Sequence, residues 1–587
     1  MQYIDSELTQ GHAREIAYFD KLHREKYRDK GQTYGEHAAQ MALRMSTDAN
    51  HQFHLNDIFS NKRFVPAGRV QAAMGAKDRE VSAFNCSVSM TIEDDINSIM
   101  QAVSNAAKIL RLGTGIGYNF SHIRPKGDLV KKLQSEASGP ISFMKIFEAM
   151  AATISSSGHR RGAQMGILNI NHPDIEEFVD AKMQKDVFRH FNFSVGVTDL
   201  FMNCLRDGKS FPLSFNGEIR KMIDPKYLWD KIIHNAYDSA EPGIIFIDRI
   251  NQDNNLWYCE KIEATNPCAE QPLPANGLCL LGSFNLTKYI RIKDKDKPVF
   301  DFISFIKDIP PVVEAYDNIF DKSTYAIPEH SFEAKNKRRM GLGLMGIANA
   351  VEYVTGSTYG SKEFNDLFGR IAKVLKNTAY NASTELARTR GAFSAFVRDK
   401  YLDGEFIKTL DTDVQANIRK YGIRNSHLIS YAPCGTIAQT VGNISSGVEP
   451  IFYHSVTRDV HMQDGKQSIT LMDYNVRHYN HYGQTLDQCT IEDHISVASI
   501  AQKHCDSSVS KTVNVPETCT YDDYQKIYLD AYKAGSKGIT VFRPTELRGS
   551  VITQAPAELK VNFTELTGEV KIKYGTSGAC ANGACEI

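Results

Sequence analysis

The sequence lacks the features that mark secreted, membrane-spanning and zinc-binding proteins. Its 587 residues include eleven cysteines but no Cys-x-x-Cys pair, which argues against zinc ribbons and a structural disulfide framework. The first residues show no basic region followed by an apolar run, and no stretch approaches about 18 uninterrupted apolar residues. We therefore expect a cytoplasmic protein with no membrane partner.

The chain also lacks an excess of either charge. It carries 68 Lys and Arg against 69 Asp and Glu, which gives a formal net charge of −1. No basic stripe compensates locally, so we expect no nucleic-acid partner. Internal repeats and low-complexity tracts are missing as well. Any phosphate groups that bind must be held by local groups rather than by a global field.

The pattern of the chain predicts three regions of different character. Apolar and charged residues alternate at helical spacing in a small N-terminal region. A long central stretch mixes helix-like windows with short apolar runs typical of buried strands, which predicts one large α/β domain. After Arg548 the composition shifts to small and polar residues, as expected for a flexible tail. The predicted regions are 1–63, 64–550 and 551–587, and the apolar runs are 166–170, 243–247 and 427–431.

The most informative local pattern is Asn-Pro-Cys-Ala-Glu at residues 266–270. Nearby prolines restrict the backbone, which favours an ordered finger. A thiol in an apolar site keeps its proton, whereas a thiyl radical at Cys268 would be uncharged and would benefit from the exclusion of water. Glu270 could remove a hydroxyl proton, and Asn266 could hydrogen-bond the same group. Taken alone, the pattern also fits a core cysteine beside a solvated carboxylate.

The surroundings of this pattern closely resemble the catalytic segment of class II ribonucleotide reductases, a family that depends on adenosylcobalamin. The resemblance covers 264–286 and continues in order through 158–166, 172–175, 338–346, 432–438, 446–452, 510–516 and 537–543. It implies a ten-stranded α/β barrel of two parallel half-sheets with a central finger loop. It also implies reduction of ribonucleotides to 2′-deoxyribonucleotides by a thiyl-radical mechanism.

The same resemblance assigns roles to five residues. Cys268 would be the thiyl radical that abstracts the ribose 3′-hydrogen, Glu270 the base for the 3′-hydroxyl and Asn266 the group that orients it. Cys86 and Cys279 would be the reducing pair that ends as a disulfide. By analogy, Cys86 would protonate the departing 2′-hydroxyl.

The pair Cys580 and Cys585 suits the role of a redox shuttle. An internal disulfide is poorly accessible to bulk reductant, so a carrier must enter the site and exchange thiols. The surrounding glycines and alanines impose little bulk, and the stretch from Val551 to Cys580 would span about 30 Å as a coil. Thioredoxin or glutaredoxin would then reduce the tail. The alternative is a two-cysteine metal clip, but without nearby histidines that zinc site is incomplete, and we expect no protein metal site.

A glycine-containing turn follows the apolar run 427–431, where backbone amides can face phosphate oxygens. It resembles the substrate-phosphate loop of the family, although Cys434 stands where the family more usually has threonine. The predicted substrate-binding residues are Asn85, Pro433, Cys434, Gly435, Thr436 and Ile437. The sequence 113–117 superficially resembles a dinucleotide loop but lacks the full glycine pattern, and its continuation matches the reductase barrel.

The resemblance also suggests regulation by deoxynucleotide effectors. The basic, glycine-rich loop 158–166 would connect an effector site to the substrate pocket, with Asp94, Arg160 and Arg161 as effector-binding residues. Asp95 is an alternative to Asp94, and without the family the two arginines would be taken as solvated charges. An effector site at a helical interface over 94–110 would fit a homodimer.

The radical source distinguishes the classes of this family. Class I catalytic chains use paired tyrosines near the C-terminus, whereas this region has only Tyr574. The Arg-x-x-Gly-Tyr setting of class III is absent, and so is the Asp-x-His-x-x-Gly pattern that supplies a histidine to cobalt. We therefore expect adenosylcobalamin without a histidine ligand, and a diphosphate in preference to a triphosphate substrate. The alternatives are a class I-type subunit that needs a separate radical-generating subunit, and a non-catalytic nucleotide-sensing thiol protein.

Overall fold

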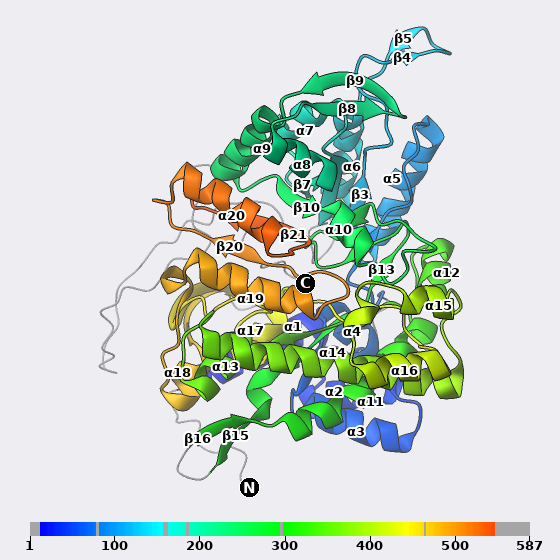
Figure 1. The fold of residues 1–587 in the computed structure, drawn as a ribbon. Helices are drawn as coiled ribbons and strands as arrows, with labels where there is room; N and C mark the ends of the chain where they lie inside the picture. The colour runs from blue at the N-terminus through cyan, green and yellow to red at the C-terminus, as the bar shows by residue number, and fades with distance from the viewer. Residues whose placement is uncertain are drawn as a thin grey trace.

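Strands from both halves of the chain meet in one eight-stranded sheet (Figure 1). The computed structural model describes residues 12–77, 81–155, 163–183, 187–293, 297–462 and 465–545. The sheet order is β13 (Leu278–Cys279), β2 (Cys86–Val88), β3 (Gly115–Asn119), β6 (Gln164–Asn169), β7 (Phe191–Val197), β10 (Gly243–Phe246), β21 (Gly538–Phe542) and β20 (Thr512–Asn514). Within this sheet, β2, β3, β6, β7 and β10 run parallel to one another. The pairs β13–β2 and β10–β21 are antiparallel.

A second sheet continues directly from the first. It contains β1 (Phe64–Pro66), β14 (Leu281–Asn285) and β17 (Gly341–Met345), and β14–β17 is a parallel pair. Only Leu280 separates β13 from β14, so one extended stretch contributes to both sheets. Isolated parallel bridges extend this side of the molecule, from Leu342 to Ile429 and from Tyr431 to Val509.

The apolar runs of the sequence correspond to buried strands in two of three cases. The predictions over 166–170 and 243–247 are confirmed by β6 and β10. The prediction over 427–431 is wrong in part, because that run forms only isolated bridges. The carboxylate of Asp506 accepts the backbone N–H groups of Leu428 at 2.7 Å and Ile429 at 3.1 Å. A side chain therefore satisfies donors that a regular ladder would otherwise use.

Helices cover both parts of the strand framework. The helices α5 to α9 lie around the part of the eight-stranded sheet drawn at the top of Figure 1, whereas α2, α3, α11, α14 and α16 form the lower part. The helices of the N-terminal half are α1 (Ala13–Tyr27), α2 (Tyr34–Met45), α3 (Ala49–Ser60), α4 (Gly68–Gly75), α5 (Ile96–Arg111), α6 (Pro140–Ser155), α7 (Ile175–Asp180), α8 (Asp199–Asp207), α9 (Pro225–Ser239) and α10 (Ile247–Gln252). Those that follow are α11 (Phe302–Lys322), α12 (Pro328–Lys337), α13 (Ile347–Thr355), α14 (Lys362–Arg390), α15 (Arg398–Leu402), α16 (Thr412–Tyr421), α17 (Gly435–Thr440), α18 (Tyr474–Tyr479), α19 (Ile491–Lys503) and α20 (Tyr521–Lys533).

Small antiparallel hairpins decorate this framework. They are β4 (Leu129–Val130) with β5 (Ser135–Glu136), β8 (Phe211–Phe215) with β9 (Glu218–Ile223), β15 (Ile290–Lys293) with β16 (Lys297–Phe300), and β18 (Ser455–Met462) with β19 (Gly465–Met472). The fold is therefore mixed α/β. The tail 551–587 lies outside the described residues, and the three-part division of the chain stays a prediction.

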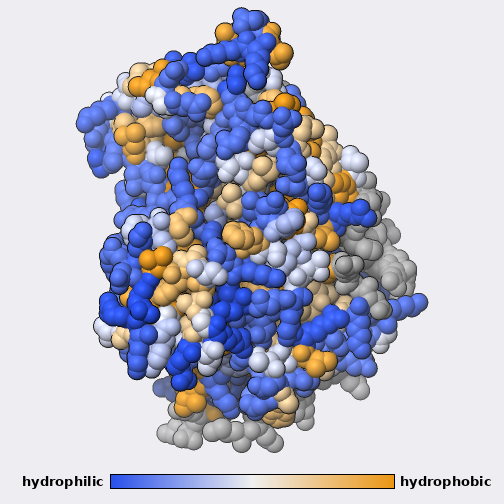
Figure 2. Space-filling model, turned by 90° about the vertical axis from the view of Figure 1, so that its right-hand side faces the viewer, coloured by the Kyte–Doolittle hydropathy of each residue, from blue (hydrophilic) through white to orange (hydrophobic). Residues whose placement is uncertain are grey.

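One face of the molecule is mainly polar. Figure 2 shows a largely hydrophilic face with small, scattered apolar areas. Within the described ranges, no helix combines the length and the apolar character needed to span a bilayer. The apolar side chains instead form two large buried clusters, one around α11 and α14 and one around β3, β6 and β7. Burial on both faces explains why β6 and β10 occur as short apolar runs in the sequence.

The predicted finger around Cys268 lies very close to the sheet, and a glycine of β3 permits this close approach. A Cβ atom at Gly117 of β3 would lie 1.8 Å from the carbonyl oxygen of Thr265. We expect Gly117→Ala to lower the free energy of unfolding by about 3 kcal/mol, because backbone would have to move away from backbone. Urea unfolding followed by circular dichroism would measure this change.

Gly369→Ala in α14 is the matched control for this substitution. Its Cβ would make only ordinary contact, 3.6 Å from Ile500 Cγ2, and alanine favours a helix. We expect unchanged or slightly increased stability. An equal loss of stability in both variants would contradict the close approach of the finger to β3.

Candidate active site

The predicted finger is an ordered loop held at both ends. Strands β11 (Ala264–Thr265) and β12 (Pro272–Leu273) pair antiparallel at its base. The N–H of Asn266 donates to the carbonyl oxygen of Gln271 at 3.1 Å, and the N–H of Gln271 donates to Asn266 Oδ1 at 3.0 Å. Ala269 has a φ of 64°, a left-handed conformation that turns the chain sharply within the loop. These contacts fix the direction of each side chain on the loop.

Two side chains of the finger form a buried polar pair. Asn266 Nδ2 donates to Glu270 Oε1 at 2.8 Å, and both residues are fully buried. Burial, with a smaller contribution from the nearby Cys86 thiol, raises the pKa of the Glu270 carboxyl to about 8. Glu270 Oε2 has no hydrogen-bond partner among the described residues. This oxygen is therefore available to a group that enters the site.

Cys86 and Cys279 face each other across the antiparallel pair β2–β13. They are register partners, and the backbone N–H of Cys86 donates to Cys279 Sγ at 3.2 Å. Burial raises the pKa of the Cys279 thiol well above its usual value, and the neighbouring Cys86 thiol adds to this shift. Both cysteines are reduced. The two cysteines are 193 residues apart in the sequence, and the pairing of β2 with β13 brings them together.

A second glycine brings the finger and this thiol pair together. A Cβ at Gly115 of β3 would lie 3.2 Å from Pro267 Cγ and 3.3 Å from Cys86 Sγ. The finger and Cys86 therefore lie over the same point of the sheet. The structure thus brings together Cys86, Cys279, Asn266, Glu270 and the loop that carries Cys268.

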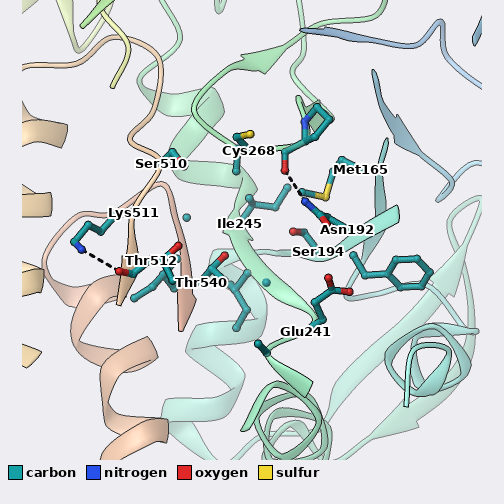
Figure 3. Close-up of a pocket in the computed structure, with 18 of the residues that line it drawn as sticks. Met165, Asn192, Ser194, Glu241, Ile245, Cys268, Ser510, Lys511, Thr512 and Thr540 are labelled. Atoms are coloured by element: carbon teal, nitrogen blue, oxygen red, sulfur yellow. Dashed lines mark hydrogen bonds between the residues drawn. The ribbon is translucent and has the colours of Figure 1, made fainter. Parts of the chain in front are cut away.

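Cys268 is partly exposed and lines a pocket of about 850 Å³, part of which is open to solvent (Figure 3). The walls come from β7, β10, β20 and β21. Asn192 of β7 donates through Nδ2 to the carbonyl oxygen of Pro267 at 3.1 Å, which ties the finger to the wall beside Cys268. No motif in the sequence singles out Asn192. Its signal is the alternation of β7, in which Phe191, Phe193 and Val195 enter the apolar cluster and the residues between them face the other way.

The predicted phosphate loop leads into the helix α17. Cys434 is the N-cap of this helix, and its N–H donates to Ser446 Oγ at 2.8 Å. Its thiol lies 3.2 Å from Ser283 Oγ, and burial raises its pKa to about 11. Gly435 and Thr436 are half-buried, Ile437 is buried, and Pro433 lines the Cys268 pocket. The Cys434 sulfur thus contacts the strand β14.

Asn85 lies immediately before β2 and is fully buried. Neither polar atom of its side chain has a hydrogen-bond partner among the described residues. An unpaired buried amide is costly, so its donor and acceptor groups are suited to a polar ligand.

The predicted effector residues are placed only in part. Asp94 accepts from Arg124 Nε at 2.7 Å and from the Arg124 backbone N–H at 3.1 Å. Asp95 instead caps α5 by accepting from the N–H groups of Asn97 and Ser98. Asp94 thus pairs with the backbone and the guanidinium of Arg124, whereas Asp95 caps a helix. Arg160, Arg161, Cys580 and Cys585 lie outside the described residues.

Comparison with known proteins identifies the family. The family described as "Ribonucleotide reductase, barrel domain" matches residues 84–542. The vitamin B12-dependent ribonucleoside-diphosphate reductase of Mycobacterium tuberculosis (strain CDC 1551 / Oshkosh) is 33% identical over an alignment of 528 residues. The alignment covers 85% of this chain and 72% of that protein. The protein of the same name from Thermoplasma acidophilum is 32% identical over an alignment of 582 residues, which covers 92% of this chain and 72% of that protein.

A protein named ribonucleoside-diphosphate reductase subunit alpha, from Chlamydia pneumoniae, is also similar. It is 26% identical over an alignment of 457 residues, which covers 68% of this chain and 43% of that protein. The family match covers most of the chain, and the two vitamin B12-dependent reductases named above are more similar to it than this subunit is. The chain therefore belongs to the ribonucleotide reductase family, in its class II branch.

Proposed function

We propose that this chain reduces ribonucleotides to 2′-deoxyribonucleotides with adenosylcobalamin as its cofactor and with ribonucleoside diphosphates as its preferred substrates. The observation that carries the proposal is the arrangement on one finger. A partly exposed cysteine, Cys268, lies between the buried, hydrogen-bonded residues Asn266 and Glu270, and the loop lies over the thiol pair Cys86 and Cys279. All three relatives quoted above carry the name ribonucleoside-diphosphate reductase, which favours the diphosphate.

Each of the five site residues would carry out a separate part of the reaction. Cys268, as a thiyl radical, takes the 3′-hydrogen, while Glu270 accepts the 3′-hydroxyl proton and Asn266 orients that hydroxyl. A pKa of about 8 suits Glu270 as a base near neutral pH. Cys86 protonates the 2′-hydroxyl, which leaves as water. Cys86 and Cys279 together supply two electrons and two hydrogens and form a disulfide, and the 3′-hydrogen is returned from Cys268.

The pocket at Cys268 fits the nucleoside part of the cofactor. It is lined by Cys268 and combines apolar walls with hydroxyl groups from Ser194, Thr512 and Thr540. Pockets for small molecules commonly combine apolar walls with a few polar groups. When bound, adenosylcobalamin would supply the radical that oxidises the Cys268 thiol. Asn192 would keep the loop in place while this occurs.

We further propose that the two sheets form the ten-stranded barrel of the family. Support comes from the pairings, since β13 and β14 form one stretch between the two sheets and the bridges at Ile429 and Tyr431 extend from β17 towards β20. On this proposal the finger occupies the centre of the barrel. The helical region 1–63, the catalytic region 64–550 and the tail 551–587 would then be its three parts.

The remaining sites follow the same assignment. Residues 433–437 would hold the substrate phosphates with the first amides of α17, and Asn85 would bind the nucleotide beside Cys86. The thiol of Cys434 contacts Ser283, so Thr436 is the better candidate for a hydroxyl contact. Asp94, Arg160 and Arg161 would bind a deoxynucleotide effector. Exposed Ile96 and Met100 on α5 support a homodimer through this helix.

Cys580 and Cys585 would reduce the internal disulfide and be reduced in turn by thioredoxin or glutaredoxin. With the prereduced protein, adenosylcobalamin and substrate but no external reductant, we expect a burst of deoxynucleotide accompanied by a Cys86–Cys279 disulfide in a peptide map. Serine at both tail positions should halve the burst, because one of two dithiols is lost. It should spare turnover supported by dithiothreitol but block turnover supported by thioredoxin.

A matched variant controls for the loss of thiols in general. Cys259 is exposed and lies outside the finger and the pocket, so Cys259→Ser should leave the burst and both turnover assays unchanged. A burst without the Cys86–Cys279 disulfide would overturn the proposed electron source. Equal loss in the dithiothreitol and thioredoxin assays would overturn the shuttle role of the tail.

A further inference from the structure

The N-terminal helix α1 packs directly against the helix that follows the predicted phosphate loop. It contacts α17, α4 and the strand β19, and Figure 1 draws α1 and α17 side by side. Tyr18 and Phe19 pack on the β18–β19 hairpin. Tyr27, at the other end of α1, shares a buried cluster with Cys434 and Ile437 of the loop. The helix lies outside the family match, which begins at residue 84, and no step described above uses it.

A buried ion pair ties the start of α1 to the distant helix α18. Glu15 Oε2 accepts from Arg477 Nη1 at 2.9 Å and from the backbone N–H of Met472 at 3.1 Å. The two charged side chains are only 8% and 2% exposed. The guanidinium also lies 5.2 Å from the centre of the Phe19 ring. A buried charge is stable only when it is paired, so Glu15 holds Arg477 in one position.

Arg477 extends this link to the end of α17. Its Nη2 donates to the carbonyl oxygen of Gly442, and its Nη1 donates to that of Met472 at 3.2 Å. Gly442 has a φ of 113°, and a Cβ there would lie 3.0 Å from Arg477 Nη2. Asn443 Nδ2 donates to the same Met472 carbonyl at 3.0 Å. The residues that terminate α17 are therefore fixed by groups outside the helix.

α17 is short enough to transmit this restraint to the phosphate loop. It has six residues, which corresponds to a length of about 9 Å. The N–H of Ala438 donates to the carbonyl oxygen of Cys434 at 2.7 Å, and the N–H of Ile444 donates to that of Ala438 at 3.2 Å. Loop, helix and terminating residues thus form one hydrogen-bonded unit. A shift at Gly442 would move the amides at the other end.

The second end of α1 is held by a buried hydrogen-bonded chain. Arg28 Nε donates to His23 Nδ1 at 3.1 Å, so the hydrogen of the neutral ring is on Nε2, which donates to Gln71 Oε1 at 2.7 Å. Gln71 Nε2 then donates to the carbonyl oxygen of Pro66 in β1 at 2.8 Å. Burial lowers the pKa of His23 well below its usual value, which keeps the ring neutral. α1 is therefore fixed relative to the strands as well as to α17.

We propose that α1 is a brace for the phosphate loop and that Glu15 and Arg477 are positioning residues for the substrate diphosphate. This inference rests on the proposed phosphate-binding role of residues 433–437. Neither side chain touches the substrate. They act by holding the loop amides where the phosphate oxygens bind, and a small misplacement of a binding group is costly. Their loss should weaken the binding of phosphates and leave the binding of the nucleoside part unchanged.

Glu15→Ala in the full-length protein with adenosylcobalamin tests the brace. KM for a ribonucleoside diphosphate should rise about tenfold, the effect of about one lost phosphate hydrogen bond. By contrast, kcat should change less than about threefold, because the lost contact serves ground-state binding. The inhibition constant of the parent ribonucleoside, which has no phosphate, should be unchanged. Glu15→Gln keeps an acceptor oxygen for Arg477 and should restore a KM close to that of the wild type.

Arg477→Lys is a second variant that keeps a cation beside Glu15. It should therefore fold even if Glu15→Ala does not. A lysine ammonium lacks the planar fork that reaches Glu15 and Gly442 together, so KM should rise about threefold for the loss of part of this contact.

Asp308→Ala is the matched control, because it removes the carboxylate partner of another buried arginine in the N-terminal region. Arg63 Nε donates to Asp308 Oδ2 at 2.7 Å, and this pair joins β1 to α11 instead of α17. It should lower the thermal unfolding temperature as Glu15→Ala does, with KM unchanged. An unchanged KM in both brace variants, an equal rise in Asp308→Ala, or a parallel rise in the ribonucleoside inhibition constant would overturn the inference. The proposed function fails separately, if the wild type with adenosylcobalamin makes no deoxynucleotide.

Discussion

Cys268→Ser is expected to abolish deoxynucleotide formation, with a loss of at least about 10⁴-fold in kcat. The serine hydroxyl has nearly the same shape as the thiol, but its O–H bond is much stronger than an S–H bond, so no equivalent radical forms. The finger is held by backbone contacts of Asn266 and Gln271 and by the Asn192 contact with Pro267. None of these contacts uses the sulfur, so the loop should keep its shape. Product analysis by chromatography measures the loss.

The variant should still bind the substrate nucleotide with near wild-type affinity, since the change removes a radical carrier and leaves the predicted binding residues intact. Cys259→Ser again serves as the control for replacement of a thiol and should retain full activity. Turnover of Cys268→Ser above about one hundredth of the wild-type rate would contradict the assignment of the radical to this cysteine. Loss of nucleotide binding would instead indicate a collapsed finger.

Glu270→Gln is expected to lower kcat by about 10²–10⁴-fold, the usual contribution of a general base. Burial raises the pKa of Glu270 to about 8. Its carboxyl is therefore mostly protonated below that pH and mostly ionised above it. Only the ionised form can accept the 3′-hydroxyl proton, so wild-type kcat/KM should rise with pH up to about 8 and fall about tenfold per pH unit well below it. The glutamine variant should lose this limb of the profile.

Glu352→Gln provides a close control for this experiment. Glu352 is a second buried glutamate whose pKa burial raises to about 8. Its Oε1 accepts the backbone N–H groups of Tyr359 at 2.9 Å and Gln484 at 3.1 Å, and a glutamine oxygen can do the same. This variant should keep both the rate and the limb near pH 8. A limb that persists in Glu270→Gln would show that another group controls it.

The sequence was sufficient for the parts of the site that lie on one short segment. Asn266, Cys268 and Glu270 all lie within residues 266–270. The prolines around them predict an ordered finger, which the hairpin of β11 and β12 confirms. Cys86 and Cys279 were paired only through the family resemblance. Nothing in their local sequences shows that β2 and β13 are neighbours, because that register is a property of the sheet.

Features that depend on strand neighbours could not be predicted from the sequence. Ser194, Gly243 and Thr540 line the Cys268 pocket, and they come together only once β7, β10 and β21 are aligned. The direction of the Cys434 thiol is a similar case, since its partner Ser283 belongs to a distant strand. The apolar character of the run 427–431 predicts a strand, and no local pattern indicates that Asp506 binds its backbone donors.

The most direct test of the account is the radical requirement of the purified chain alone. The protein is incubated with a ribonucleoside diphosphate and dithiothreitol, with and without adenosylcobalamin, and with hydroxocobalamin as the control that lacks the nucleoside. The account predicts deoxynucleotide only with adenosylcobalamin and no need for a second protein. No product with adenosylcobalamin, but product once a radical-generating partner subunit is added, would contradict it.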